Sequence, residues 1–336
     1  MTRYDAHHRA ISYLRISVTD RCNLRCVYCM PPEGVPSCAH EEILRYEEIE
    51  TVVRAAAELE FHKVRLTGGE PLVRKGIVDL VRMLAAVPGI DDLSMTTNGI
   101  LLRRYADELA RAGLKRVNVS LDTLRPERFR QITRGGELAD TLAGIQAARR
   151  AGLTPVKINA VIIRGLNADE VVDLAYKTVS DGWHVRFIEW MPLGGPAMGE
   201  IQWAEGLVTT DEIRAQIEAA LGPLEPASVE AGAGPARYYR LAEAGGPLAA
   251  GTIGLISALS DHFCGTCNRL RLTADGKLRP CLFSDDEIDL RTPLRAGAGV
   301  NEIKDLLAAG IAAKPKRHHL AECEPAHGRA MSQIGG

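Results

Sequence analysis

The sequence predicts an α/β fold, an incomplete TIM-like (β/α)6 barrel closed by a C-terminal region. Two observations predict it. Short apolar runs alternate six times with segments of helical periodicity, which implies parallel strands joined by right-handed crossovers. Glycine-rich or polar residues also follow five of the strands. A barrel gathers its site at the carboxyl ends of several strands, whereas an open sheet uses one crevice. A barrel is therefore favoured, and six units rather than eight predict an incomplete one.

The expected elements follow one another in a regular order. Strands are expected at residues 11–18, 63–67, 92–96, 116–121, 155–163 and 185–190. Helices are expected between them at residues 46–59, 77–84, 101–112, 138–151 and 169–180. Each helix carries apolar residues three and four positions apart, as burial of one helix face requires.

The composition changes near residue 221. We therefore expect residues 1–220 to form the barrel region and residues 221–336 to form the C-terminal region. Residues 222–251 are rich in Gly, Ala and Pro, which predicts a linker or loose crossover with one strand at 238–241. Further expected elements are a strand at 268–273, a turn at Gly276, a helix at 300–312 and an irregular tail.

The amino-acid composition argues against several classes of protein. The 336 residues are 46% hydrophobic, and 41 Lys and Arg against 43 Asp and Glu give a net charge of −2. This balance does not indicate nucleic-acid binding. We find no apolar run of membrane-spanning length and no signal peptide, so we expect a soluble cytoplasmic protein. The 8 cysteines then indicate metal or redox chemistry rather than disulfides.

Three cysteines lie in one loop after the first strand, at C-x3-C-x2-C spacing: Cys22, Cys26 and Cys29. Thiolates hold iron–sulfur clusters, and a four-iron cube with three protein ligands keeps one iron open for a reactant. A closed zinc site needs four ligands, but Cys38 and His40 lie nine and eleven residues beyond the loop. The loop therefore favours a cluster. Cys38 and Cys323 are expected to be incidental.

A second group comprises Cys264, Cys267 and Cys281. A second open-iron cluster explains three ligands, and a zinc site completed by His262 is the alternative. The cluster is favoured, so the region that closes the barrel is expected to carry a second iron–sulfur site.

The strand between these cysteines alternates at period two, which places Arg269 and Arg271 on one face. Guanidinium groups bind phosphate oxygens well, so this face predicts an anion site. A strand edge with solvated arginines is the alternative. Arg15, Arg65 and Arg186 are expected to converge on the same cavity.

Gly68, Gly69 and Glu70 follow the second strand. Two glycines allow a ligand to approach the backbone closely, and the glutamate is able to hold an ammonium group. Together with the cysteine loop, this segment resembles the radical S-adenosylmethionine (SAM) superfamily. Nearly the whole chain is similar to the GTP 3′,8-cyclases of molybdenum cofactor biosynthesis. The matching segments are residues 14–22, 65–71, 119–122, 186–192, 263–271 and the terminal Gly-Gly.

The resemblance implies a lyase with two [4Fe–4S] clusters, one on each cysteine group, and SAM as cofactor. A 5′-deoxyadenosyl radical would abstract hydrogen from C3′ of GTP, and the C3′ radical would attack guanine C8. The product would be (8S)-3′,8-cyclo-7,8-dihydroguanosine 5′-triphosphate, a molybdopterin precursor. The second cluster would bind the guanine base through its open iron.

The resemblance also implies roles by matching position. The SAM contacts would be Tyr28, Gly69, Ser120 and Met191. The GTP contacts would be Arg15, Arg65, Thr96, Lys157, Arg269, Leu270 and Arg271, with Thr273 a further candidate. The residues acting in the reaction would be Arg15, Arg269, Arg271, Gly335 and Gly336, the last two because the tail enters the site. The alternative for the tail is the disorder common at chain termini.

The implied partners are GTP, an electron donor such as flavodoxin or ferredoxin, and the downstream cyclic pyranopterin monophosphate synthase. Nucleic acid and membrane are not expected, and a homodimer is one option. Two other functions stay open: a radical SAM enzyme acting on a peptide, and a zinc-stabilised binding protein without catalysis.

Overall fold

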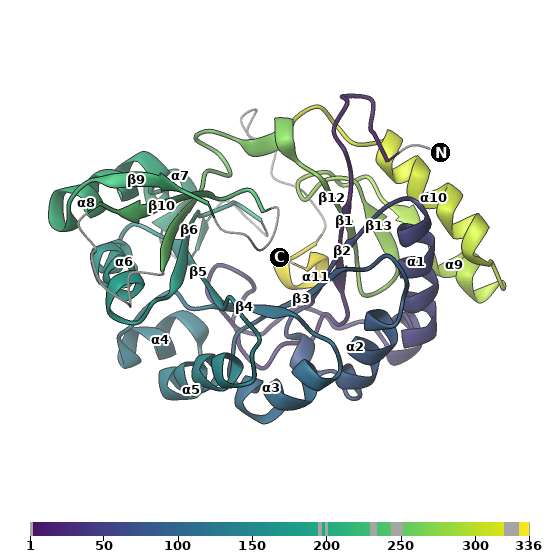
Figure 1. Cartoon of the computed structure of the whole chain (residues 1–336), viewed down its shortest axis with the longest axis horizontal. Helices are drawn as coiled ribbons and strands as arrows, with labels where there is room; N and C mark the ends of the chain where they lie inside the picture. The colour runs from purple at the N-terminus through teal and green to yellow at the C-terminus, as the bar shows by residue number, and fades with distance from the viewer. Residues whose placement is uncertain are drawn as a thin grey trace.

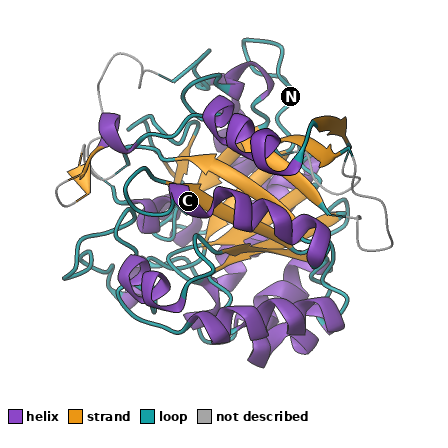
Figure 2. Ribbon diagram, turned by 90° about the vertical axis from the view of Figure 1, so that its left-hand side faces the viewer, coloured by secondary structure: helices purple, strands orange, loops and turns teal. Residues whose placement is uncertain are grey.

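The computed structural model describes residues 3–193, 197–198, 201–228, 234–242, 251–318 and 329–335. It shows a curved sheet with helices on its outer side (Figure 1). A view turned by 90° shows the strands gathered at the centre with helices around them (Figure 2).

The strands of the main sheet are β1 (Tyr13–Ser17), β2 (Lys63–Thr67), β3 (Asp92–Thr97), β4 (Arg116–Ser120), β5 (Lys157–Ile162), β6 (His184–Glu189), β9 (Leu224–Ala227), β10 (Arg237–Leu241), β11 (Thr252–Ile256), β12 (Arg269–Leu272), β13 (Lys277–Arg279) and β14 (Ile288–Asp289). A separate hairpin pairs β7 (Ala197–Met198) with β8 (Ile201–Gln202).

The helices are α1 (Tyr46–Glu58), α2 (Ile77–Ala85), α3 (Leu102–Arg111), α4 (Pro126–Thr133), α5 (Leu138–Arg150), α6 (Val171–Ser180), α7 (Trp203–Gly206), α8 (Thr210–Leu221), α9 (Arg291–Arg295), α10 (Val300–Ala312) and α11 (Met331–Ile334). Short 3-10 helices are η1 (His40–Glu42), η2 (Pro71–Val73), η3 (Ala168–Glu170) and η4 (Phe263–Thr266).

The strand order in the main sheet is β14-β13-β12-β1-β2-β3-β4-β5-β6-β11-β10-β9. Strands β1 to β6 are parallel neighbours, β12 joins β1 in parallel, and β11 joins β6 in parallel. The edge strands are antiparallel, and no pairing joins the two edges among the described residues. The expected incomplete barrel is therefore confirmed.

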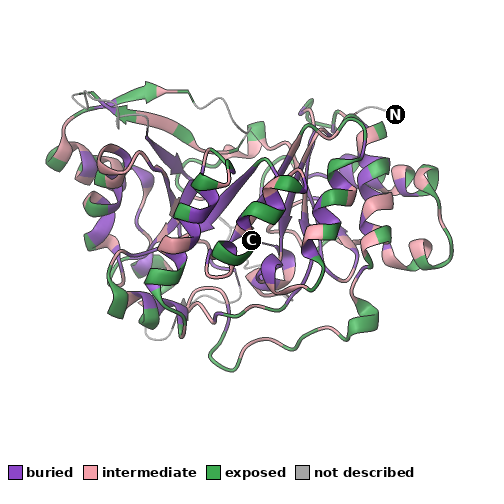
Figure 3. Ribbon diagram, turned by 60° about the horizontal axis from the view of Figure 1, so that its bottom comes forward, coloured by how far each residue is buried: buried purple, intermediate pink, exposed green. Residues whose placement is uncertain are grey.

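The alternation of residues along each strand separates the core from the inner face. In β1, Leu14 and Ile16 are fully buried in the apolar core, which also includes Val52 and Val53 of α1. Successive strand side chains point to opposite faces, so Arg15 points to the inner side of the curved sheet. Figure 3 shows the strands mostly buried and the outer faces of the helices exposed.

All six strands and five helices expected between residues 11 and 190 form, and the strand expected at 238–241 forms as β10, but the rest of the segment at 222–251 is not simply the expected linker. Within it, β9 and β10 pair as a hairpin that extends the sheet, and β10 joins β11. Residues 229–233 and 243–250 lie outside the described part. An edge strand tolerates proline and weak alternation of apolar and polar residues. Strand β9 therefore could not be predicted from the composition. The tail expected to be irregular forms the short helix α11.

Candidate active site

The first cysteine loop follows the carboxyl end of β1. Cys22, Cys26 and Cys29 are free thiols. Burial, and then the neighbouring Cys22, raise the pKa of Cys29 to about 12. Burial and then Cys29 likewise raise the pKa of Cys26. Three adjacent half-buried thiols with raised pKa values favour a positively charged centre that converts them to thiolates, so these residues fit an iron–sulfur cluster.

The glycine pair after β2 packs directly against this loop. The amide of Gly69 donates to the carbonyl of Thr19 at 2.7 Å. A Cβ atom on Gly69 would lie 2.4 Å from the carbonyl oxygen of Arg21, so only glycine fits this contact. The loops after β1 and β2 thereby form one unit around the cysteines.

The Glu70 carboxylate is used within the protein. It accepts hydrogen bonds from Leu72 N at 3.0 Å, Thr97 Oγ1 at 2.7 Å and Asn98 N at 2.7 Å, and the residue is 1% exposed. Its side chain therefore ties the loop after β2 to the loop after β3. The expectation that this carboxylate also holds an ammonium group stays a prediction.

The residues expected to contact SAM do not all lie together. Tyr28 and Ser120 line one small cavity with Cys26 and Asp122, and the Tyr28 hydroxyl donates to Asp122 Oδ2 at 2.7 Å. Met191 lines a different, larger cavity. Asp122 lies two residues after β4, at one of the polar strand ends that the sequence indicates, but no role was predicted for it.

The larger cavity lies on the inner face of the sheet and is strongly cationic. It is lined by one carboxylate, Asp92, and by eight basic side chains: Arg15, Lys63, Arg65, Arg116, Lys157, Arg186, Arg269 and Arg271. Arg116 forms an ion pair with Asp92, so this carboxylate is already neutralised. Thr96 also lines the cavity.

The electrostatics of this cavity favour an anionic ligand. Burial and neighbouring cations lower the pKa of Lys157 to about 7 and that of Arg271 to about 10. Arg186 is 5% exposed, and its Nε and Nη2 atoms have no hydrogen-bond partner among the described residues. Buried charges are costly unless they are paired, so the cavity suits a ligand with several negative charges.

Most of the residues predicted to contact GTP line this cavity, but two of them do not. Arg15, Arg65, Thr96, Lys157, Arg186, Arg269 and Arg271 line the cationic cavity. The Leu270 side chain lies instead in the apolar core, and Thr273 Oγ1 bonds to Asp275 Oδ1 at 2.6 Å. Lys63 and Arg116 also line the cavity and are not among the residues predicted from the sequence. The i, i+2 spacing of Lys63 to Arg65 was the available signal.

The second cysteine group borders the same space. Cys264, Cys267 and Cys281 line a cavity that shares Arg269, Arg271, Phe263 and Leu282 with the cationic one. Burial opposes ionisation of Cys267, but Arg269 and Lys314 outweigh it and lower the pKa of that thiol to about 6. The Lys314 ammonium lies 3.8 Å from Cys267 Sγ. These contacts fit a thiolate ligand.

In the part of the chain that the structure describes, no three His, Cys, Asp or Glu side chains converge to hold a single metal ion. Zinc requires such convergence. A four-iron cube takes its thiolates on different irons, so the three sulfurs can stay further apart.

The two cysteine groups lie at opposite ends of the sheet. Cys22 follows the carboxyl end of β1, whereas Cys267 precedes β12, which runs parallel to β1 with Tyr13 opposite Arg269. The cationic side chains lie on the face between these two ends, with Arg271 within β12.

The C-terminal tail lies at the carboxyl ends of β1 and β2 and reaches Arg271 within β12. Helix α11 lies on the inner side of the curved sheet (Figure 1). The backbone of Ser332 hydrogen-bonds to the Cys29 thiol, and the carbonyl of Gly335 accepts from Arg271 Nη1 at 3.1 Å. A Cβ atom on Gly335, whose φ is +70°, would lie 2.4 Å from Thr67 Oγ1. Gly336 lies outside the described residues.

Comparison with known proteins decides the family. The chain is 60% identical to the GTP 3′,8-cyclase of Pelotomaculum thermopropionicum, over 99% of both chains. The chain belongs to the GTP 3′,8-cyclase family. The family's enzymes from Heliobacterium modesticaldum and Moorella thermoacetica are each 53% identical to it, over 99% of both chains. It is therefore an enzyme.

Two family models match this GTP 3′,8-cyclase family member. The Radical SAM superfamily model matches residues 16–176, and the Molybdenum Cofactor Synthesis C model matches residues 183–320. The first match implies SAM and a [4Fe–4S] cluster, which the loop at residues 22–29 fits. A solved structure, Streptococcus suis SuiB bound to S-adenosylmethionine, has a TM-score of 0.60. Its identity is 14%, with 88% of this chain and 68% of that chain covered, so it supports the fold alone.

No helix in the described ranges is both long enough and apolar enough to cross a membrane.

Proposed function

We propose that this protein cyclises GTP between C3′ and C8 for molybdenum cofactor biosynthesis. One observation carries the proposal: a cavity lined by eight basic side chains adjoins the second cysteine group. A nucleoside triphosphate matches this arrangement because its phosphates are anionic and its base reaches beyond them. The peptide alternative does not explain so many buried cations.

The site residues have separable tasks in this proposal. When bound, SAM and the first cluster would supply the 5′-deoxyadenosyl radical that removes hydrogen from C3′ of GTP. The electron donor would supply the electron that cleaves SAM and the electron that, with a proton, reduces the nucleotide radical left once C3′ has bonded to C8. Arg65, Lys157 and Arg186 neutralise the triphosphate, since they lie on strands β2, β5 and β6 of one sheet and line one cavity. Arg271 orients the substrate from β12 while it holds the Gly335 carbonyl. Burial of these groups excludes water from the reacting atoms.

The remaining assignments are proposed on the same basis. Cys22, Cys26 and Cys29 hold the first cluster, and Cys264, Cys267 and Cys281 hold a second [4Fe–4S] cluster. Tyr28, Gly69, Ser120 and Met191 contact SAM. Arg15, Arg65, Thr96, Lys157, Arg269 and Arg271 contact GTP, and Leu270 contributes only its backbone because its side chain is in the core. Arg15, Arg269, Arg271, Gly335 and Gly336 act in the reaction.

The two regions divide the chemistry: residues 1–220 generate the radical, and residues 221–336 hold the second cluster and the tail. We further propose that the protein is cytoplasmic and that flavodoxin or ferredoxin is its electron donor. The product is proposed to pass to cyclic pyranopterin monophosphate synthase. A homodimer is the proposed alternative to a monomer.

The test is anaerobic incubation of the reconstituted protein with GTP, SAM and a reductant, followed by identification of the product. We expect GTP to be consumed together with SAM, giving the 3′,8-cyclo nucleotide and 5′-deoxyadenosine. Formation of 5′-deoxyadenosine without any modification of GTP would refute the proposed substrate and favour the peptide alternative.

Metal analysis tests the second cluster. Anaerobically purified protein should contain about eight irons per chain, because two four-iron clusters are proposed. Replacing Cys264 and Cys267 together by serine should reduce this to about four while SAM cleavage continues. Stoichiometric zinc without sulfide in the wild-type protein would instead support the zinc-stabilised alternative.

We expect GTP binding to be linked to proton uptake by Lys157. Burial, then Arg186 and Arg116, lower its pKa to about 7, so the amine is largely neutral at pH 8. A bound triphosphate favours the ammonium form and raises this pKa, so binding at pH 8 should take up roughly one proton. GTP affinity should therefore fall as the pH rises above 7. Calorimetry in buffers of different ionisation enthalpy measures the uptake.

The Lys157→Met variant should lose this uptake, whereas Lys115→Met, at an exposed position, should retain it. Comparing the variants separates Lys157 from titration of the triphosphate itself. Equal proton uptake in wild type and Lys157→Met would show that Lys157 does not face the phosphates.

A further inference from the structure

The position of the short C-terminal helix depends on contacts outside the helix. Helix α11 spans only Met331–Ile334, and a single helical turn has little stability of its own. Ser332 and Ile334 are nevertheless each 2% exposed, and Gly335 meets Arg271 in the barrel. Some contact outside the helix must therefore fix its position.

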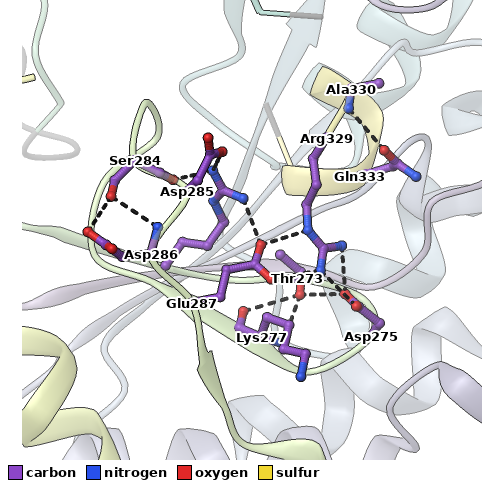
Figure 4. Close-up of polar contacts among 11 residues, drawn as sticks. Thr273, Asp275, Lys277, Ser284, Asp285, Asp286, Glu287, Arg329, Ala330 and Gln333 are labelled. Atoms are coloured by element: carbon purple, nitrogen blue, oxygen red, sulfur yellow. Dashed lines mark hydrogen bonds and ion pairs between the residues drawn. The ribbon is translucent and has the colours of Figure 1, made fainter. Parts of the chain in front are cut away.

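Arg329, two residues before α11, makes that contact (Figure 4). Its Nη1 and Nη2 donate to the two carboxylate oxygens of Asp275 at 3.0 and 2.9 Å. Its Nε and Nη2 donate to the two oxygens of Glu287 at 2.7 and 2.9 Å. One guanidinium thus spans two carboxylates, and bidentate charge-assisted pairs fix direction as well as distance. We call Arg329, Asp275 and Glu287 the tail clasp.

The clasp is more than a surface ion pair. The side chains of Arg329, Asp275 and Glu287 are 19%, 16% and 20% exposed, so solvent screens them only in part. Asp275 also accepts from Thr273 Oγ1 at 2.6 Å, and Glu287 also accepts from Arg279 Nη1 at 2.7 Å. Both carboxylates are therefore held before Arg329 binds them.

The clasp sits on the same hairpin that carries Arg271. Asp275 lies in the turn between β12 and β13, and Arg271 lies within β12. The tail is thus attached to this hairpin at two points, at Arg329 and at the Gly335 carbonyl. The first attachment sets how far the second reaches into the barrel.

We propose that Arg329 is a positioning residue, which through Asp275 and Glu287 holds the C-terminal tail in register with Arg271 and Cys29. Arg329 does not line the cationic cavity, so it acts on the reaction only through the tail. The inference rests on the proposed role of the tail in cyclisation. The placement of the tail can be measured without any turnover.

The test compares Arg329→Ala and Asp275→Asn with the wild type. The second variant removes a charge but keeps the shape of the turn, which guards against misfolding. Arg130→Ala is the matched control, because Arg130 forms a similar two-bond pair with Glu137 on the exposed surface. Amide hydrogen exchange of residues 329–335, read by mass spectrometry, reports the placement. Iron content, SAM cleavage and GTP cyclisation are measured in parallel.

We expect exchange of the tail amides to accelerate roughly tenfold or more in both clasp variants. GTP cyclisation should fall by a similar factor, while iron content and SAM cleavage stay at wild-type levels. Wild-type exchange in Arg329→Ala would overturn the proposal. So would a released tail with unchanged cyclisation. If the wild type cyclises no GTP at all, the proposed function fails, and the exchange result still decides whether the clasp places the tail.

Discussion

Replacing Cys26 with alanine should reduce the formation of 5′-deoxyadenosine below detection. The first cysteine group supplies three thiols, and a cube left with two protein ligands is neither held nor oriented for SAM. Binding of GTP should persist in this variant, because Cys26 borders a different cavity from the one lined by the eight cations. Anaerobic product analysis and equilibrium binding of GTP measure the two effects separately.

Cys38→Ala is the matched control. Cys38 is also a half-buried free thiol, and its backbone amide donates to Asp20 Oδ2 at 2.6 Å, a contact that the substitution leaves in place. We expect wild-type iron content and SAM cleavage. Continued SAM cleavage by Cys26→Ala would disprove the assignment of the first cluster, and loss of cleavage in Cys38→Ala would show that the ligand set is incomplete.

Replacing Arg271 with alanine should weaken GTP binding roughly 10- to 100-fold, since a charge-assisted hydrogen bond contributes about 1.5–3 kcal/mol. SAM cleavage should continue, because the first cysteine loop is intact. Cyclisation should decrease further than binding does, because the variant also loses the hydrogen bond to the Gly335 carbonyl. Calorimetric titration and product analysis under anaerobic conditions measure the two losses.

The free Arg271→Ala protein should be no less stable to heat than the wild type. Burial and then Arg269 lower the pKa of Arg271 to about 10, so its charge is unfavourable until an anion binds. Arg214→Ala, which removes an exposed partner of Glu218, should change neither GTP affinity nor cyclisation. Unchanged GTP affinity in Arg271→Ala would remove the reason for assigning β12 to the substrate.

Features of the site that lie within a few consecutive residues could be predicted, whereas contacts between distant segments could not. The spacing of Cys22, Cys26 and Cys29 and the alternation of Arg269 with Arg271 are properties of a few consecutive residues, so both could be identified without a fold. The side-chain contacts of Glu70 could not. Its three partners belong to two loops, and only the adjacency of β2 and β3 brings Thr97 and Asn98 to its carboxylate.

The C-terminal region shows the same limit. Strand β9 carries little apolar patterning, and its pairing with β10 depends on the sheet edge already present. The family resemblance implied that Leu270 contacts GTP. The alternation of side chains along β12 instead directs the Leu270 side chain to the core. Arg329 gave no signal, since its partners Asp275 and Glu287 lie 54 and 42 residues away.

The sequence by itself determined which chemistry the chain can perform, because ligand spacing and strand periodicity are encoded within short segments. Only the tertiary structure decided where that chemistry meets. Parallel pairing of β1 with β12 puts the two cysteine groups at opposite ends of one curved sheet, and the tail reaches Arg271 on the face between them. These placements depend on strand order and register, which are set by packing between segments far apart in the chain.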